Sequence, residues 1–137
     1  MNIIDSSGWL EYFADGENAD FFAPAIEDSE NLLVPVICLY EVFKRISQLR
    51  DTSTAQTSIG DMLNGRVIQL DESLALSAAQ ISLDLKLAMA DSFVLAAARA
   101  HSAVLWTQDG HFKELSGVKY IAKKLKIQNQ PGVPPGL

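Results

Sequence analysis

Four carboxylates occupy positions along this chain from which they could hold a metal ion together. Asp5 and Asp109 each stand shortly after a short apolar run that predicts a buried strand. Glu41 falls in the second turn of an expected helix, and Asp91 falls in the first turn of another. Because sites in α/β sheets form outside the carboxyl ends of strands, all four side chains can face one edge of a sheet.

Carboxylates brought close together repel one another unless a cation lies between them. Oxygen ligands suit Mg²⁺ or Mn²⁺ rather than zinc, and such a cation activates water for phosphate chemistry. Each acid also has a simpler interpretation. Asp5 could cap the helix that follows it, and Asp91 could complement a helix dipole. Glu41 could pair with Arg45 one turn later on the same helix.

Strands alternate with helices along the chain. The expected strands cover 2–4, 32–34, 66–70, 103–106 and 118–121. The expected helices cover 8–13, 17–29, 36–49, 51–63, 71–85 and 90–101, with one helical turn within 110–115. Helical connections between successive strands predict an α/β protein with a mostly parallel sheet covered on both faces.

Apolar residues at helical spacing predict the core. The expected core stripe of the helix 36–49 is Val36, Leu39, Val42, Phe43 and Ile46. At the end of the weaker helix 51–63, the expected packing residues are Ile59, Met62 and Leu63. Three further residues are expected in the core, namely Trp9, Trp106 and the single cysteine, Cys38. A lone cysteine in an apolar run forms no internal disulfide and acts as a small buried hydrophobe.

Composition indicates a globular domain. The 137 residues are 48% hydrophobic and 20% charged, which allows a sizeable core. The net charge of −6 argues against coating nucleic acid by bulk electrostatics. However, residues 1–43 carry −9 and residues 44–137 carry +3. This asymmetry fits either a basic rim beside an acidic pocket or an ordinary solvated surface.

We expect one domain over residues 1–122, followed by a basic, Pro- and Gly-rich mobile tail over residues 123–137. No N-terminal basic region precedes an apolar core, and no apolar run approaches the roughly 20 residues that span a bilayer. We therefore expect a cytoplasmic protein that is neither exported nor inserted into a membrane.

Four short motifs resemble those of one protein family. They are Ile-Ile-Asp-Ser-Ser at 3–7, Val-Pro-Val-Ile-Cys-Leu-Tyr-Glu-Val at 34–42, Met-Ala-Asp-Ser at 89–92, and Trp-Thr-Gln-Asp at 106–109 with Phe112 following. Each motif alone is weak. In this order and at these separations, they resemble the PIN-domain ribonucleases, and among them the small toxins of the VapBC toxin–antitoxin type. The resemblance covers nearly the whole chain.

The resemblance implies a three-layer PIN-like fold with a parallel five-stranded sheet. The implied catalytic and metal-binding residues are Asp5, Glu41, Asp91 and Asp109, which would hold Mg²⁺ or Mn²⁺. The hydroxyl of Ser6 or Thr107 could support this acidic cluster. The resemblance further implies endonucleolytic cleavage of RNA, a homodimer, and inhibition by a small antitoxin protein. Apolar residues in excess of what one sheet face covers, on the helix 36–49 and the segment after it, independently predict a homodimer.

One departure from the family pattern concerns His111, because many family members carry another acid at this position. Its presence puts a second metal ion in doubt more than the first. His111 could touch a phosphate, but we favour an exposed histidine in a turn. The two histidines do not form a zinc site, since neither a cysteine pair nor a His-Glu-x-x-His pattern accompanies them.

Basic residues are the candidates for contacts with the substrate. The four that we select are Lys44, Arg45, Lys86 and Arg99, although any of them could simply be a solubilising residue. Three functions are then compatible with the sequence. The first is a metal-dependent ribonuclease that acts as a toxin, the second is a housekeeping nuclease for RNA processing, and the third is a metal-binding module of the same fold without turnover.

Overall fold

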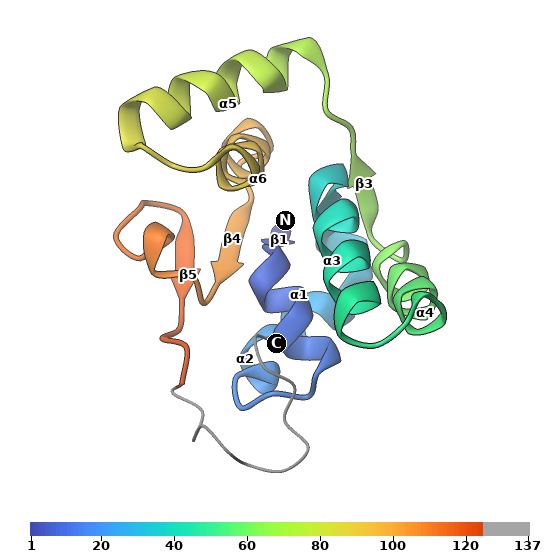
Figure 1. The fold of residues 1–137 in the computed structure, drawn as a ribbon. Helices are drawn as coiled ribbons and strands as arrows, with labels where there is room; N and C mark the ends of the chain where they lie inside the picture. The colour runs from blue at the N-terminus through green and yellow to red at the C-terminus, as the bar shows by residue number, and fades with distance from the viewer. Residues whose placement is uncertain (125–137) are drawn as a thin grey trace.

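The structure is a computed structural model that describes residues 1–124. In this part of the chain, five strands form one sheet in the order β3-β2-β1-β4-β5, and each neighbouring pair is parallel. The strands are β1 (Asn2–Ile4), β2 (Leu32–Pro35), β3 (Arg66–Ile68), β4 (Val104–Thr107) and β5 (Val118–Tyr120). The α/β class is confirmed, and this sheet is entirely parallel (Figure 1).

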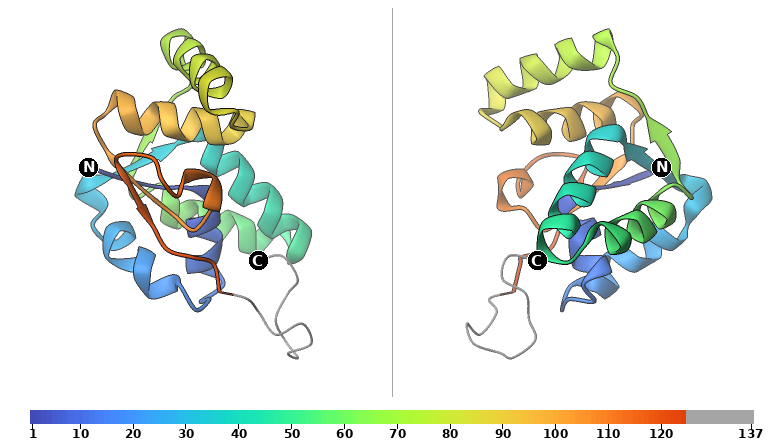
Figure 2. Two further views of the ribbon diagram at one scale, coloured as in Figure 1. Left: turned by 90° about the vertical axis from the view of Figure 1, so that its left-hand side faces the viewer. Right: turned by 45° about the vertical axis from the view of Figure 1, so that its right-hand side comes forward.

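Helices connect the strands and cover both faces of the sheet. They are α1 (Ser6–Phe13), α2 (Ala19–Glu27), α3 (Val36–Leu49), α4 (Thr52–Met62), α5 (Glu72–Leu85) and α6 (Met89–Ala100), with short 3-10 turns η1 (Ser29–Asn31) and η2 (Gly110–Phe112). In all views, α1 and α2 lie below β1, whereas α5 and α6 lie above it (Figures 1 and 2). Because crossovers between parallel strands are right-handed, the change of direction between β3 and β4 moves the chain to the second face.

The sheet centre and α6 form the core. The strand residues of β2 are all buried, as a parallel strand covered on both faces requires. On α6, five consecutive residues from Val94 to Ala98 are buried, and the helix contacts both β2 and β4. Small alanine side chains allow this helix to lie close to the strands. The expectation of a buried, alanine-rich helix is confirmed.

The sheet-facing side of α3 differs from the expected stripe. Cys38, Val42 and Ile46 are buried, as one residue every helical turn predicts. The prediction that Phe43 belongs to the core stripe was wrong, because its exposed fraction is 37%. Phe43 lies about 100° around the helix from Val42, and this rotation turns it away from the sheet. It shares the outer side of α3 with Tyr40, whose exposed fraction is 60%.

Among the other core predictions, some were confirmed and one was wrong. Met62 is fully buried at the end of α4, but Leu63 is exposed, so its expected packing was also wrong. Leu63 is one position past the last residue of α4, Met62, and it is Met62 that packs into the core. Trp9 and Cys38 are fully buried. Trp106 is partly buried against the core, with its ring 5.2 Å from that of Phe21.

The described part of the chain includes only the first two residues of the tail predicted over 123–137, and the remainder lies outside it. Within residues 1–124, no helix is both long enough and apolar enough to cross a membrane. The longest helices, α3 and α5, contain 14 residues each.

Candidate metal centre

The parallel sheet brings acids from distant parts of the chain to its carboxyl edge. Asp5 directly follows β1 and Asp109 follows β4, and these two strands are neighbours. Helix α3 begins directly after β2 at the same edge, which places Glu41 in its second turn. Helix α6 ends just before β4 begins, so its first turn, with Asp91, returns to the carboxyl edge.

Asp5 is the most buried of the four acids, with an exposed fraction of 5%. Its Oδ1 accepts hydrogen bonds from the Ser7 hydroxyl at 2.7 Å and from the Gly8 N–H at 2.9 Å. Its Oδ2 accepts one from the Thr107 hydroxyl at 2.5 Å. Burial raises the pKa of Asp5 to about 6, although these hydrogen bonds lower it; the negative charge of Asp109 raises it further.

Two hydroxyl groups connect the acids to one another. The Thr107 hydroxyl that donates to Asp5 also accepts a hydrogen bond from the Asp109 N–H at 2.8 Å. The Ser6 hydroxyl donates to Glu41 Oε1 at 2.6 Å. Because Ser6 is next to Asp5 in the chain, this bond ties α3 to the start of α1. The orientation of these carboxylates is therefore fixed by short polar contacts between elements.

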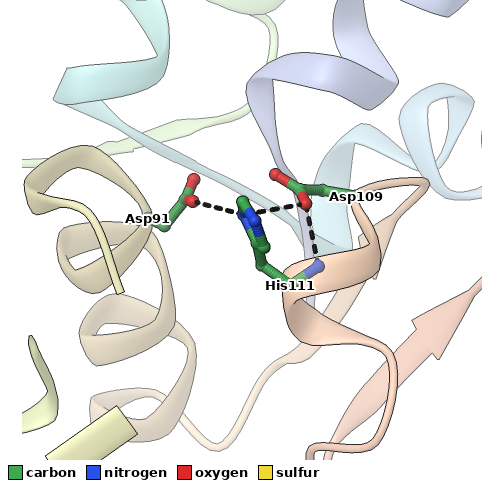
Figure 3. Close-up of side chains that lie close together, drawn as sticks. All are labelled: Asp91, Asp109 and His111. Atoms are coloured by element: carbon green, nitrogen blue, oxygen red, sulfur yellow. Dashed lines mark hydrogen bonds and ion pairs between the residues drawn. The ribbon is translucent and has the colours of Figure 1, made fainter. Parts of the chain in front are cut away.

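Asp91 and Asp109 face each other with the His111 imidazole between them (Figure 3). The His111 Nδ1 atom lies 3.2 Å from Asp109 Oδ1 and 3.8 Å from Asp91 Oδ2. Asp91 comes from the first turn of α6, and the other two residues come from the turn after β4. One ligand atom from each of the three residues lies within 4.8 Å of the other two.

The charges of the acids act on one another. The pKa of Asp91 is raised by burial first and then by Asp109 and Glu41, while His111 lowers it. The buried Cys38 thiol, whose pKa is raised chiefly by burial, also experiences the negative charges of Asp5, Glu41 and Asp91. Asp5, Glu41 and Asp91 therefore act on one buried thiol, and the charge of Asp109 acts on Asp5 and Asp91.

The donor set fits a divalent cation. Asp91 and Asp109 offer carboxylate oxygens at close range, and a cation between them would remove the repulsion that raises the pKa of Asp91. Asp5 and Glu41 are not part of the group whose ligand atoms lie within 4.8 Å of one another, and they are held at the same edge by Thr107 and Ser6. Carboxylate oxygens are the ligands that Mg²⁺ and Mn²⁺ prefer.

Capping accounts for some of these acids but not for Asp91. Asp5 caps α1 through the Gly8 N–H, and Asp109 caps η2 through the His111 N–H. At the start of α6 the N-cap residue is Ala88, and no side-chain hydrogen bond caps this helix. Asp91 instead faces His111. Asp5 therefore caps a helix and also experiences the charge of another acid, whereas Asp91 experiences the charges of other acids and caps no helix.

The basic residues selected from the sequence lie at different distances from the acids. Lys86 is exposed in the turn that precedes α6, on the side where Asp91 lies. Lys44 and Arg45 follow Glu41 on α3, and the Lys44 Nζ atom lies 5.7 Å from the centre of the Tyr40 ring. Arg99 occupies the last turn of α6. At about 1.5 Å per residue, it is roughly 12 Å along the helix from Asp91.

The family model described as PIN domain matches residues 3–118. The chain belongs to the PIN domain family. The match includes all four acids, so the resemblance seen in the short motifs extends over the domain. The described architecture, a five-stranded parallel sheet between helices, is consistent with a PIN domain. A search of curated proteins found no match.

Solved PIN-like structures share this fold at low sequence identity. A toxin–antitoxin complex from Klebsiella pneumoniae has a TM-score of 0.75 at 18% identity, covering 87% of this chain and 96% of the other. VapC20 from Mycobacterium tuberculosis, described as a sarcin-ricin loop cleaving toxin, has a TM-score of 0.72 at 15% identity, covering 85% and 95%. FitAcB from Neisseria gonorrhoeae has a TM-score of 0.65 at 22% identity, covering 82% and 91%.

His111 is the residue of this PIN domain that sequence reasoning placed outside the acidic cluster. It is exposed and lies in a turn, as expected, with 74% of its side chain exposed. The structure adds that its imidazole points between Asp91 and Asp109 (Figure 3). One signal was present in the sequence: His111 follows Asp109 by two residues, which is the spacing at which a capping aspartate binds a backbone N–H.

Proposed function

We propose that this PIN domain is a metal-dependent endoribonuclease and the toxin of a type II toxin–antitoxin pair. The observation that carries this proposal is the close group of Asp91, Asp109 and His111 at the carboxyl edge of the sheet, the edge at which Asp5 and Glu41 also stand. Burial raises the pKa values of Asp5 and Asp91 most, and neighbouring acids raise both further, so without a cation this arrangement costs stability. A site that binds a cation gains affinity from it.

Asp91 and Asp109 would hold the cation, with Asp5 and Glu41 completing the acidic surroundings. When bound, Mg²⁺ or Mn²⁺ supplies the Lewis acid that phosphodiester hydrolysis requires. Side-chain and backbone groups of the chain hold the acids in position. Thr107 fixes Asp5 relative to the backbone of Asp109. Preorganised charged groups of this kind lower a reaction barrier because they need no rearrangement as the charge develops.

The RNA would approach the carboxyl edge from the exposed side of Asp91. Lys86 stands at the entrance to α6, and Lys44 and Arg45 stand along α3, so all three can meet phosphates on either side of the acids. Arg99 would reach the RNA only where the RNA extends past the acids toward the C-terminal end of α6. The positive charges of these basic residues would offset the repulsion between the acids and the RNA phosphates.

The toxin assignment is supported by the named structural neighbours. One is a toxin–antitoxin complex, and another is a toxin described as cleaving the sarcin-ricin loop. We propose that this chain is likewise inhibited by a small antitoxin. We also propose that it forms a homodimer through the outer side of α3 and α4.

A cleavage assay tests the enzymatic part of this proposal. Purified protein should cleave RNA with Mg²⁺ or Mn²⁺ and lose this activity in excess chelator. Asp91→Asn should lower the rate on the order of 10²-fold, as losses of electrostatic groups in such sites do. Asp51→Asn is the matched control, because Asp51 caps α4 and lies outside the cluster. Undiminished cleavage in excess chelator would refute metal dependence and would indicate a ribonuclease that needs no metal ion.

Expression in cells separates the toxin from a housekeeping nuclease and from a metal-binding module without turnover. A toxin should arrest growth when expressed alone and should copurify with a small partner encoded beside it. RNA ends mapped after brief expression of wild type and Asp91→Asn should differ at specific positions. Normal growth with active purified enzyme would favour RNA processing, and an inactive but metal-binding protein would favour the third function.

A further inference from the structure

The side chain of His111 occupies a position that suits a metal ligand. Ligand atoms at right angles around an octahedral cation with bonds of about 2.1 Å lie roughly 3.0 Å apart, and opposite ones lie roughly 4.2 Å apart. The separations of Nδ1 from Asp109 Oδ1 and Asp91 Oδ2, 3.2 and 3.8 Å, fall between these limits. The two separations from Nδ1 therefore match those between ligands of one ion, and one ligand atom from each of the three residues lies within 4.8 Å of the other two (Figure 3).

The turn that carries His111 is anchored on both sides. The His111 N–H donates to Asp109 Oδ1 at 2.9 Å, which fixes the start of η2. The next residue, Phe112, has no exposed surface and inserts into the core. The backbone of His111 is thus fixed beside the acids, although most of its side chain is exposed. The imidazole projects from a turn that is tied to Asp109 on one side and to the core through Phe112 on the other.

An imidazole changes which cation the site favours. Mg²⁺ prefers oxygen ligands in near-ideal octahedral geometry, whereas first-row transition metals bind imidazole nitrogen well. We propose that His111 is a direct nitrogen ligand and that it makes Mn²⁺ the preferred ion of this site over Mg²⁺. This inference rests on the proposed function only in requiring that Asp91 and Asp109 bind a cation.

Metal binding without RNA tests the proposal. Metal-free protein is titrated with Mn²⁺ and, separately, with Mg²⁺ by calorimetry, and the Mn²⁺ complex is examined by pulsed electron paramagnetic resonance for coupling to nitrogen. Wild type should show coupling to one imidazole nitrogen. His111→Ala should lose this signal and bind Mn²⁺ on the order of 10-fold more weakly, while its affinity for Mg²⁺ changes less than about 3-fold. His111→Asp should reverse the preference toward Mg²⁺.

His101→Ala is the matched control. His101 is the other histidine of the chain and ends α6 at the opposite end from Asp91. This variant should keep both the nitrogen coupling and the Mn²⁺ affinity. Because both histidines are exposed, neither substitution disturbs the core, and thermal unfolding of each variant checks this.

Three outcomes would overturn the proposal. Absence of nitrogen coupling in wild type would leave His111 as an ion-pair partner of the carboxylates only. Equal weakening of Mn²⁺ and Mg²⁺ binding by His111→Ala would assign it a general electrostatic role. Absence of binding by either ion to wild type would overturn the proposed function as well, whereas the first two outcomes leave that function intact.

Discussion

Asp5 combines two tasks, since it caps α1 and also stands among like charges. Its carboxylate accepts three hydrogen bonds, yet burial still raises its pKa to about 6 from 3.8. The folded protein therefore binds a proton at Asp5 between about pH 4 and 6 that the unfolded chain releases. Above the folded pKa, the ionised group lowers the stability of the fold.

We predict that metal-free wild type becomes more stable as the pH falls from 7 through about 6, with the gain levelling off near pH 4. The contribution of Asp5 is on the order of 2–3 kcal/mol. Asn still caps a helix but does not ionise, so Asp5→Asn should flatten this dependence. Urea unfolding at pH 7, 6, 5 and 4 measures both proteins.

Asp51 provides the control with the opposite sign. It caps α4 on the surface, and hydrogen bonding to Thr54 lowers its pKa. It therefore stabilises the fold above its unfolded pKa and loses this contribution as the pH falls. Asp51→Asn should leave the gain between pH 7 and 6 in place. An Asp5→Asn variant with the wild-type pH profile would contradict the raised pKa.

Asp91→Asn should raise the melting temperature of the metal-free protein at neutral pH by a few degrees. The variant removes one charge from a group whose pKa is raised by burial, Asp109 and Glu41, and it keeps the shape of the side chain. Added Mg²⁺ should raise the wild-type midpoint and move that of the variant much less. Differential scanning calorimetry with chelator and with Mg²⁺ measures both effects.

The opposite result has a clear meaning. If Asp91 only complemented the dipole of α6, its replacement would leave stability unchanged or lower it. An Asn variant that melts lower in chelator and gains as much from Mg²⁺ as wild type would remove Asp91 from the metal site.

Helix α1 begins at Ser6 and is capped by Asp5, so its packing sets the position of both residues. The helix approaches β1 and α2 closely at Gly8. A Cβ atom at Gly8 would lie 2.6 Å from Ile4 Cγ2 and 2.7 Å from Phe22 Cε1, and both of these residues are fully buried. Neither neighbour has space to move away. The absence of a side chain at Gly8 is what permits this contact.

Gly8→Ala should therefore destabilise the protein by about 1–3 kcal/mol or more, as overpacking of a core does. Gly60 lies within α4 and has no atom within 4 Å of an added Cβ. Gly60→Ala should stabilise by about 0.5–1 kcal/mol because alanine favours the helix. Chemical denaturation compares the two variants. Equal effects of the two substitutions would show that helix propensity, not the contact with Ile4 and Phe22, governs Gly8.

The outer side of α3 and α4 is a candidate assembly surface. Tyr40 and Phe43 are exposed on α3, and Leu63 is exposed at the end of α4. A cavity of about 340 Å³ is lined by Leu39, Tyr40, Phe43, Lys44 and Ile59. Exposed apolar residues that gather around a hollow are typical of an interface.

We predict that the protein is a homodimer at micromolar concentration and that Phe43→Glu makes it monomeric. A carboxylate at this position would be buried without a partner in the dimer, which is costly. Leu76→Glu on the exposed side of α5 is the control and should stay dimeric. Multi-angle light scattering with size-exclusion chromatography measures the mass. A monomeric wild type, with or without metal, would contradict this assembly.

The sequence alone determined the elements and their order. Alternation of apolar strands with helical periodicity predicted each strand and helix within a few residues, because these patterns depend on neighbours along the chain. Cys38 was correctly placed in the core on the same basis. The sequence also showed that Asp5 and Asp109 each follow a strand, and in a parallel sheet this places both at the same edge.

Only the tertiary structure decided which faces and side chains meet. Phe43 was assigned to the core because periodicity defines a stripe only to within one neighbouring residue, and the contact with β2 fixes the rotation of α3. His111 was assigned to an exposed turn without a link to the acids, because its partner Asp91 is 20 residues away in sequence and comes from another element. Contacts of this kind depend on how α6 and η2 pack against one sheet edge, and no local pattern encodes that distance.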